Sequence, residues 1–173
     1  MGSDGVSVVR TEVDGHESAL RGLLLDYYEF ADREARAYFD ELTGIDIEAA
    51  VEDDIDRLES AAVDDPLFLA RDGDRIVGSV QLKRLDETTA EVKRLYVTPD
   101  YRGTGIGQRL MAELLDGAER DGFETLRLGV GPSLDAARSL YEDLGFEYTS
   151  RYDQSGAPEA VGDEWGFMRR SLD

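Results

Sequence analysis

Three glycines at alternate positions, Gly103, Gly105 and Gly107, stand in the stretch "VTPDYRGTGIGQRLMAELL" (residues 97–115), directly before a strongly helical pattern. Glycine weakens helices and strands, so a cluster of glycines at the start of a helix indicates that something approaches the backbone closely. The first N–H groups of a helix have no intrahelical acceptor and lie at the positive end of the helix dipole. The stretch therefore predicts an anion site with a phosphate as its natural ligand, and a plain tight turn is the alternative.

Three phosphate-binding patterns compete for this loop. A Walker loop needs a lysine after its last glycine, and the chain has none there. A dinucleotide-binding fingerprint needs a small residue where Gln108 stands. The third pattern, RxxGxG, is met by Arg102, Gly105 and Gly107. The sequence favours this third pattern.

The run "AEVKRLYVTPDYRGTGIGQRLMAELL" and the later run "ARSLYEDLGF" together resemble the GNAT family of N-acetyltransferases. In order, the match covers the acetyl-CoA strand, the pyrophosphate loop, the crossover helix, the next strand and the "LYxxLGF" helix. The resemblance is best over residues 66–147 and fits one N-acetyltransferase domain over residues 1–173. It implies an acetyl-CoA-dependent enzyme that moves an acetyl group to a primary amine of a small molecule or a peptide.

The resemblance also implies that acetyl-CoA is held largely by main-chain groups. Residues 91–97 would form a strand that parts from its neighbour and bonds the pantetheine arm. The loop from Arg102 to Gln108 would wrap the pyrophosphate, with Gly105 and Gly107 placed where a Cβ would obstruct the approach. Many members have an asparagine where this chain has Leu134, so that contact is lost or comes from Ser133. The expected cofactor-binding set is Leu95, Tyr96, Val97, Arg102, Gly103, Thr104, Gly105, Ile106, Gly107, Gln108 and Ser133.

Two residues match catalytic positions of the family. Tyr141, in "SLYEDLGF", matches the general acid, and an ordinary phenol with a pKa of about 10 stays protonated at neutral pH. Glu91 has the spacing from Arg102 of the glutamate base in histone-modifying members, whereas many small-molecule members use a chain of waters. Because the chain has no cysteine, an acetyl-cysteine intermediate is excluded and direct transfer in a ternary complex is expected. A backbone N–H near Tyr96 would polarise the thioester carbonyl.

The acceptor side is less clearly marked in the sequence. Tyr27, Tyr28 and Phe30 of the first helix, and the loop "YDQSGAP" (152–158), are candidates to line it. No metal site is predicted, because the acidic pairs lack any ligand pattern. The alternative function is a non-catalytic CoA-binding or acyl-sensing module of the same fold, and Tyr141 argues against it because such a module needs no general acid. A toxin-type transferase acting on charged tRNA is disfavoured by the acidic composition.

Hydrophobic periodicity predicts the elements that position these residues. Short strands alternate apolar and polar residues, and the longer segments repeat apolar residues with helical spacing. The strand, helix, strand order around residues 90–130 indicates a parallel crossover. The expected strands cover residues 6–11, 66–70, 75–82, 90–97, 123–130, 146–152 and 164–172, and the helices are centred on Leu24, Ile55, Leu114 and Leu140. We therefore expect an α/β GNAT fold, a mixed and mostly antiparallel sheet of about seven strands with about four helices.

The composition limits the choice of partners. The chain carries 39 acidic residues against 19 Lys and Arg, a formal net charge of −20. Such a surface repels nucleic acids and anionic membranes, so neither is expected as a partner. Of the basic residues only two are Lys, and this composition resembles that of proteins from salt-loving organisms, which predicts a need for high salt. No apolar run is long enough to span a membrane, so a cytoplasmic protein is expected, with a homodimer as one option for its assembly.

Overall fold

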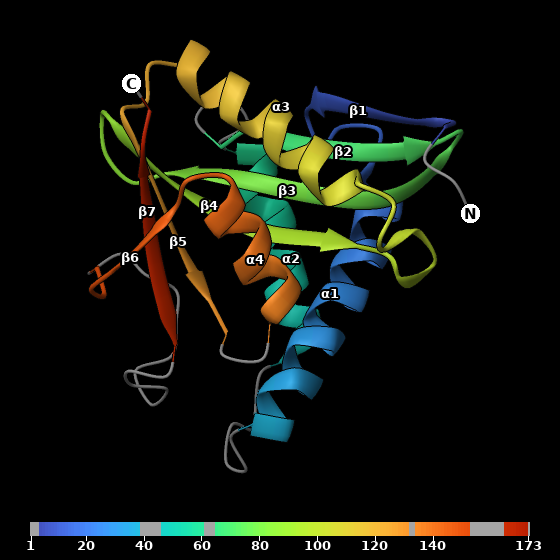
Figure 1. Cartoon of the computed structure of the whole chain (residues 1–173). Coiled ribbons are helices and arrows are strands. Elements are labelled where there is room, and N and C mark those ends of the chain that lie inside the picture. Colours follow the sequence, from blue (N-terminus) through green and yellow to red (C-terminus); the bar gives the residue numbers. More distant parts are fainter. Residues whose placement is uncertain (1–3, 39–45, 61–64, 132–133, 153–164, 173) are drawn as a thin grey trace.

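Seven strands form one mixed sheet in the computed structural model of the chain, which describes residues 4–38, 46–60, 65–131, 134–152 and 165–172 (Figure 1). Their order is β1-β2-β3-β4-β5-β7-β6, and every neighbouring pair is antiparallel except the parallel pair β4 and β5. The predicted mixed, mostly antiparallel α/β sheet is confirmed. The strands are β1 (Val6–Thr11), β2 (Leu67–Asp72), β3 (Arg75–Arg84), β4 (Thr89–Val97), β5 (Thr125–Val130), β6 (Glu147–Thr149) and β7 (Gly166–Ser171).

The described residues also form four α-helices, as predicted, and the helices cover both faces of the sheet (Figure 1). Successive strand residues point to opposite faces, so Phe68 packs in the core beneath α3 and α4, whereas Leu69 packs beneath α1 and α2. The sheet thus separates two apolar clusters. The helices are α1 (Glu17–Tyr38), α2 (Ile47–Ser60), α3 (Ile106–Arg120) and α4 (Asp135–Asp143), and a 3₁₀ turn covers Pro99–Tyr101.

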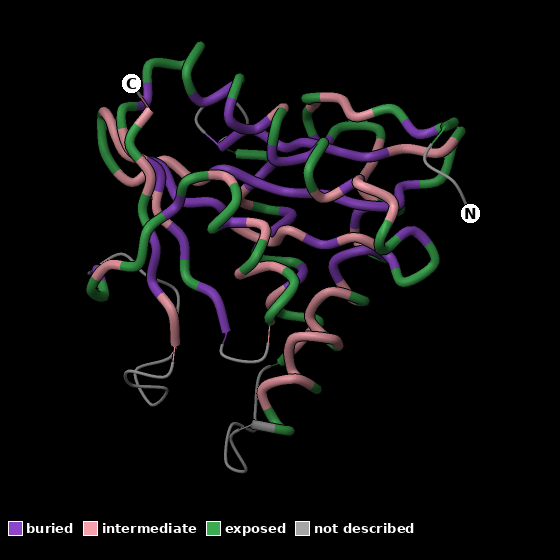
Figure 2. Tube along the Cα trace, in the orientation of Figure 1, coloured by how far each residue is buried: buried purple, intermediate pink, exposed green. Residues whose placement is uncertain are grey.

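Burial is uneven along α1. Leu20, Leu23 and Leu24 are buried, whereas residues 25–37 are only half-buried or exposed. Figure 2 shows this contrast between the two ends of α1, beside central strands that are buried over much of their length. The second half of α1 therefore leaves its aromatic side chains partly accessible.

Strands β4 and β5 pair over a short distance and then part. Their parallel register covers only Thr89 with Thr125, Ala90 with Leu126 and Glu91 with Arg127. Beyond these three pairs the two strands diverge, as Figure 1 shows. Residues 92–97 of β4 thus have no β5 partner on that edge, as the family resemblance implied for this strand.

A bulge in β4 lies just beyond this point. Opposite β3, Gln81 pairs with Lys93 and Ser79 pairs with Tyr96, so β4 carries one extra residue between these pairs. Arg94 lies in this insertion with a φ of 58°, a left-handed conformation that costs a non-glycine residue about 1–2 kcal/mol. Bulges bend a strand and redirect its side chains. This bulge accompanies the divergence of β4 from β5.

Strand β6 is shorter than predicted. The alternating pattern of residues 146–152 predicts a longer strand, but pairing with β7 covers only Glu147, Tyr148 and Thr149. After Thr149 the chain leaves the sheet edge and buries Tyr152, whose ring packs edge-on against Phe167 at 5.8 Å between ring centroids. The buried aromatic residue therefore belongs to the connection that follows the strand.

Candidate active site

The loop before α3 presents backbone amides that no carbonyl uses. The first main-chain bond of the helix runs from the Arg109 N–H to the Gly105 carbonyl at 3.1 Å, and no bond within the described residues takes the amides of residues 103–108. Gly105 caps the helix with a φ of 85° and without a side-chain hydrogen bond. Gly103 has a φ of 76°. These amides suit an anion.

Two neighbours fix the shape of this loop. The Thr104 hydroxyl donates to the Tyr101 carbonyl at 2.5 Å. Tyr101 is buried, and its own hydroxyl donates to Asp72 on β2. The loop is thus anchored to the sheet by contacts that leave its amides free.

Gly107 differs from the other two glycines of the loop. It lies in the first turn of α3 without a positive φ, and a Cβ there would lie 3.5 Å from Leu140 Cδ2 of α4. This is an ordinary contact distance, so the packing of α3 against α4 leaves room for a Cβ at Gly107. The expectation that its Cβ would obstruct a ligand stays a prediction.

The Arg102 side chain turns toward α1. Its Nε donates to the Val97 carbonyl at 3.0 Å, and its guanidinium lies 4.8 Å from the Phe30 ring centroid and 5.3 Å from that of Tyr96. The Tyr96 ring is buried against α1, with ring centroids 6.0 Å from Tyr27 and from Phe30. The side chain of Tyr96 is therefore a core aromatic, and only its main chain lies on the open edge of β4 with those of Leu95 and Val97.

Tyr141 combines a buried ring with an unbonded hydroxyl. It lies on α4, is 6% exposed, and packs edge-on against Phe146 at 5.7 Å. Its hydroxyl forms no hydrogen bond within the described part of the chain. Burial, and then the nearby Tyr27 phenol on α1, raise the pKa of Tyr141 above the ordinary value. The hydroxyl stays protonated and can act as a proton donor.

Glu91 is buried on β4 at 3% exposure and held by two groups. The Tyr152 hydroxyl donates to Glu91 Oε2 at 2.5 Å, and Lys93 Nζ lies 3.3 Å from Oε1. Burial, and then this contact with Glu91, raise the pKa of Tyr152. The predicted carboxylate is thus in place. The sequence analysis did not predict its partner Tyr152, because 61 residues separate the two and no spacing pattern connects them.

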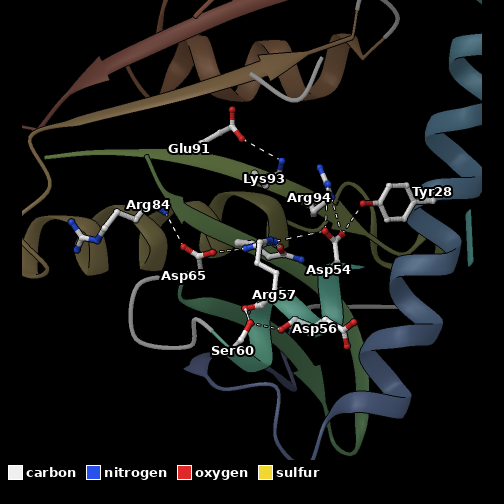
Figure 3. A network of polar contacts seen from close by, with 11 residues as sticks. Tyr28, Asp54, Asp56, Arg57, Ser60, Asp65, Arg84, Glu91, Lys93 and Arg94 are labelled. Carbon is white, nitrogen blue, oxygen red and sulfur yellow. Dashed lines mark hydrogen bonds and ion pairs between the residues drawn. The ribbon is translucent and has the colours of Figure 1, made fainter. Parts of the chain in front are cut away.

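The predicted acceptor residues on α1 lie beside a polar network that joins α1, α2 and β4 (Figure 3). The Tyr28 hydroxyl donates to Asp54 Oδ2 at 2.7 Å, and Arg94 Nε donates to the same oxygen at 3.0 Å. Arg57 lies 3.7 Å from Asp54 Oδ1. Burial is the main cause that raises the pKa of Tyr28. The Asp54 carboxylate raises it further, and the positive charge of Arg94 opposes the rise. The Tyr28 hydroxyl therefore has a structural partner, while the Tyr27 ring packs edge-on against both Tyr28 and Tyr96 of β4.

Comparisons with known proteins agree with this architecture. The model of the acetyltransferase (GNAT) family matches residues 24–146. The chain is 32% identical over 106 residues to the uncharacterized N-acetyltransferase YsnE of Bacillus subtilis, covering 60% of this chain and 67% of that protein. It is 43% identical over 81 residues to the N-alpha-acetyltransferase RimI of Mycobacterium tuberculosis, covering 45% of this chain and 49% of that protein. A crystal structure of an acetyltransferase from Streptococcus agalactiae has the same fold, with a TM-score of 0.74, 22% identity and coverage of 98% and 99% of the two chains.

The chain belongs to the GNAT family. This membership supports the acetyl-CoA-dependent N-acetyltransferase activity that the sequence analysis predicted. Two features of this GNAT domain fit the co-substrate: the free amides of residues 103–108 suit its pyrophosphate, and the unpaired edge of β4 suits its pantetheine arm. The chain spans about half the length of RimI and two thirds of YsnE.

Some predicted features of this GNAT domain lie outside the described residues. Ser133 and the loop after Tyr152 fall outside the described ranges, and Leu134, in the place of the usual asparagine, packs against the core beneath α4. Within those ranges, no group of His, Asp or Glu side chains could hold a metal ion. No helix among them is long and apolar enough to cross a bilayer.

Proposed function

We propose that this GNAT enzyme transfers the acetyl group to a primary amine by direct attack within a ternary complex. Three features support the proposal: the free amides before α3, the unbonded Tyr141 hydroxyl on α4, and the buried Glu91, the last β4 residue that pairs with β5. Tyr141 comes from one face of the sheet, and Tyr27, which acts on its pKa, comes from the other. The site therefore spans the gap between the strands.

Acetyl-CoA supplies the activated acyl group as a thioester. The main chain of residues 95–97 and the amides of residues 103–108 would hold it, with Ser133 as a further candidate. A backbone N–H of the open β4 edge near Tyr96 would stabilise the negative charge that develops on the acyl oxygen.

The two catalytic side chains have separate roles. The acceptor nitrogen forms a C–N bond with the acyl carbon as the C–S bond breaks. Glu91 accepts the proton that the nitrogen loses, directly or through a water, while the Tyr152 hydroxyl holds this carboxylate in place. Tyr141 donates its proton to the departing sulfur. The absence of cysteine from the chain supports direct attack over an acetyl-cysteine intermediate.

The acceptor we propose is an amine on a small molecule or a peptide. Tyr27, Tyr28 and Phe30 are the α1 residues expected to border its path, since they lie near the parted strands and are only half-buried. The net charge of −20 argues against nucleic acid or an anionic membrane as a partner. The same charge supports a cytoplasmic protein that functions at high salt. A homodimer is one assembly compatible with the proposal.

Amine-dependent release of CoA tests the proposal. Purified protein in molar KCl should release free CoA from acetyl-CoA only when a suitable amine is added, and initial rates should follow sequential kinetics. Binding of acetyl-CoA without transfer to any amine, peptide or polyamine in a broad panel would instead identify a non-catalytic CoA-binding module.

A further inference from the structure

Four polar side chains share one face of β3 and β4, at the point where β5 diverges from β4. Gln81 lies opposite Lys93, and Lys83 lies opposite Glu91. Their strand neighbours, such as Leu82 and Val92, pack in the core on the other face, so these four side chains face α2. Directly opposed residues in antiparallel strands have Cβ atoms about 5 Å apart. The four groups thus form one polar patch beside Glu91, which we call the β3–β4 patch.

Gln81 has a hydrogen-bond donor without a partner. The residue is fully buried, at 0% exposure. Its Oε1 accepts a hydrogen bond from Arg57 Nη2, which fixes the orientation of the amide. Its Nε2 finds no acceptor among the described residues. A buried donor without an acceptor is costly, so an acceptor oxygen from a ligand would stabilise this position.

Glu91 and Lys93 form an ion pair that is not fully satisfied. Lys93 Nζ lies 3.3 Å from Glu91 Oε1, yet this oxygen lacks a hydrogen bond of good geometry within the described ranges. The Lys93 side chain keeps 12% of its surface exposed. Lys93 also lies beyond the last residue of β4 that pairs with β5. It therefore borders the gap between the parted strands.

Other cations near the patch are already committed. Arg94 pairs with Asp54, and Arg57 pairs with Asp65 at 2.9 Å as well as with Gln81 (Figure 3). By contrast, Lys93 has three N–H donors and, among the residues that the structure describes, only the Glu91 contact. Lys83 makes no ion pair within the described ranges, but it lies opposite Glu91, which still pairs with β5. Lys93 and Gln81 are therefore the donors with unused capacity nearest the gap.

We infer that the acceptor is an amine that carries a carboxylate next to its amino group, such as a free α-amino acid. This inference rests on the proposed function. A zwitterion of this kind matches the Glu91–Lys93 pair charge for charge, with its amino group toward Glu91 and its carboxylate toward Lys93 and Gln81 Nε2. On a chain with a net charge of −20, such local donors would be needed to hold a carboxylate.

Paired substrates test the inference. Free L-amino acids are compared with their own carboxamides, and with peptides that begin with the same residue, by acetyl-CoA-dependent release of CoA in molar KCl. For the best amino acid, kcat/KM should exceed that of its amide by about 10- to 100-fold, because a charge-assisted hydrogen bond in a buried site is lost with the carboxylate.

Variants of Lys93 then test whether the preference for the free acid comes from the β3–β4 patch. Lys93→Met should reduce the acid-to-amide ratio to about one, and Lys93→Arg should keep part of it. Arg120→Met is the control outside the patch: it removes an exposed positive charge at the end of α3, and it should leave the ratio within about twofold of wild type. Acetyl-CoA affinity, measured by calorimetry, should be the same in all four proteins.

The outcomes separate this inference from the proposed function. Equal use of the acid and the amide by the wild type, a preference for peptides, or a ratio that survives Lys93→Met would overturn the inference and leave acetyl transfer intact. If acetyl-CoA binds but no amine of any kind is acetylated, the proposed function fails as well.

Discussion

Tyr141 and Tyr152 are both buried phenols, but their hydroxyls are bound differently. Burial raises the pKa of each, and Tyr152 also donates to Glu91 at 2.5 Å. Tyr141 forms no hydrogen bond within the described residues and is therefore free to give its proton to a leaving group. Two residues of the same type thus have separate roles because their neighbours differ.

Lys93 leads to a prediction at the scale of single residues, on how the binding of a carboxylate depends on pH. Burial is the main cause that lowers the pKa of Lys93. The positive charge of Arg94 lowers it further, with a smaller effect from Lys83, and the Glu91 carboxylate partly opposes this. Lys93 keeps its charge below this lowered pKa and loses it as pH rises. A carboxylate ligand held by Lys93 should therefore bind more weakly at pH values that leave an ordinary lysine charged.

A 2-hydroxy acid matched to the preferred amino acid is the suitable probe, because it has no amine to titrate. Its inhibition constant should begin to rise at a pH below 10.5, the ordinary lysine pKa. The Arg120→Met control should show the same profile as the wild type. An inhibition constant that stays flat up to that pH would contradict the role of Lys93.

At the scale of elements, the start of α3 offers a prediction with an internal control. Gly105 and Gly122 lie at the two ends of α3 with φ values of 85° and 84°. Alanine at either position should cost about 1–2 kcal/mol of unfolding free energy because of the left-handed backbone. Only Gly105→Ala should also weaken acetyl-CoA binding, by several-fold, because it moves the free amides.

Denaturant unfolding and calorimetric titration of both variants separate these effects. Equal acetyl-CoA affinities for Gly105→Ala and Gly122→Ala would remove the loop from the binding site. The glycine loop could be recognised from the sequence because a positive φ at a helix start leaves a local signature.

The contact between α2 and the sheet depends on Asp54. This residue is 5% exposed and binds Tyr28, Arg94 and Arg57. Asp54→Ala should lower the free energy of unfolding by about 3–5 kcal/mol, because the mostly buried Arg94 guanidinium loses its counter-charge and the Tyr28 hydroxyl loses its acceptor. Its exposed neighbour offers the control: Asp53→Ala should stay within about 0.5 kcal/mol of wild type. Similar losses in the two variants, measured by urea unfolding, would show that the network does not hold α2.

Much of the fold could be predicted from local patterns. Period-two strands, the apolar face of α3 and the glycines before it are encoded within short windows, and each is found where expected. The bulge at Arg94 could not be predicted, because arginine has no preference for the left-handed conformation that it adopts. The Tyr152–Glu91 bond was also missed, since it depends on where the chain runs after β6 relative to β4. Contacts between distant segments are decided by the tertiary fold.

At the scale of the whole molecule, the negative net charge determines how stability responds to salt. A net charge of −20 on 173 residues gives a self-repulsion that dissolved salt reduces, since the screening length falls from about 10 Å at 0.1 M to about 3 Å at 1 M. The thermal midpoint should therefore rise steadily with KCl concentration into the molar range. Uncharged sucrose at equal osmolality should not reproduce the full rise. A midpoint that is independent of KCl would contradict the prediction that the protein is adapted to high salt.

The effect of Tyr141→Phe tests the central claim most directly, because this change removes one oxygen atom and keeps the buried ring. Turnover of the preferred amine and acetyl-CoA affinity are measured for wild type and variant in molar KCl. The account predicts a fall in kcat of about 10²- to 10⁴-fold, the usual contribution of a general acid, with the Kd for acetyl-CoA nearly unchanged. An unchanged kcat would contradict the assignment of Tyr141 as the acid that completes acetyl transfer.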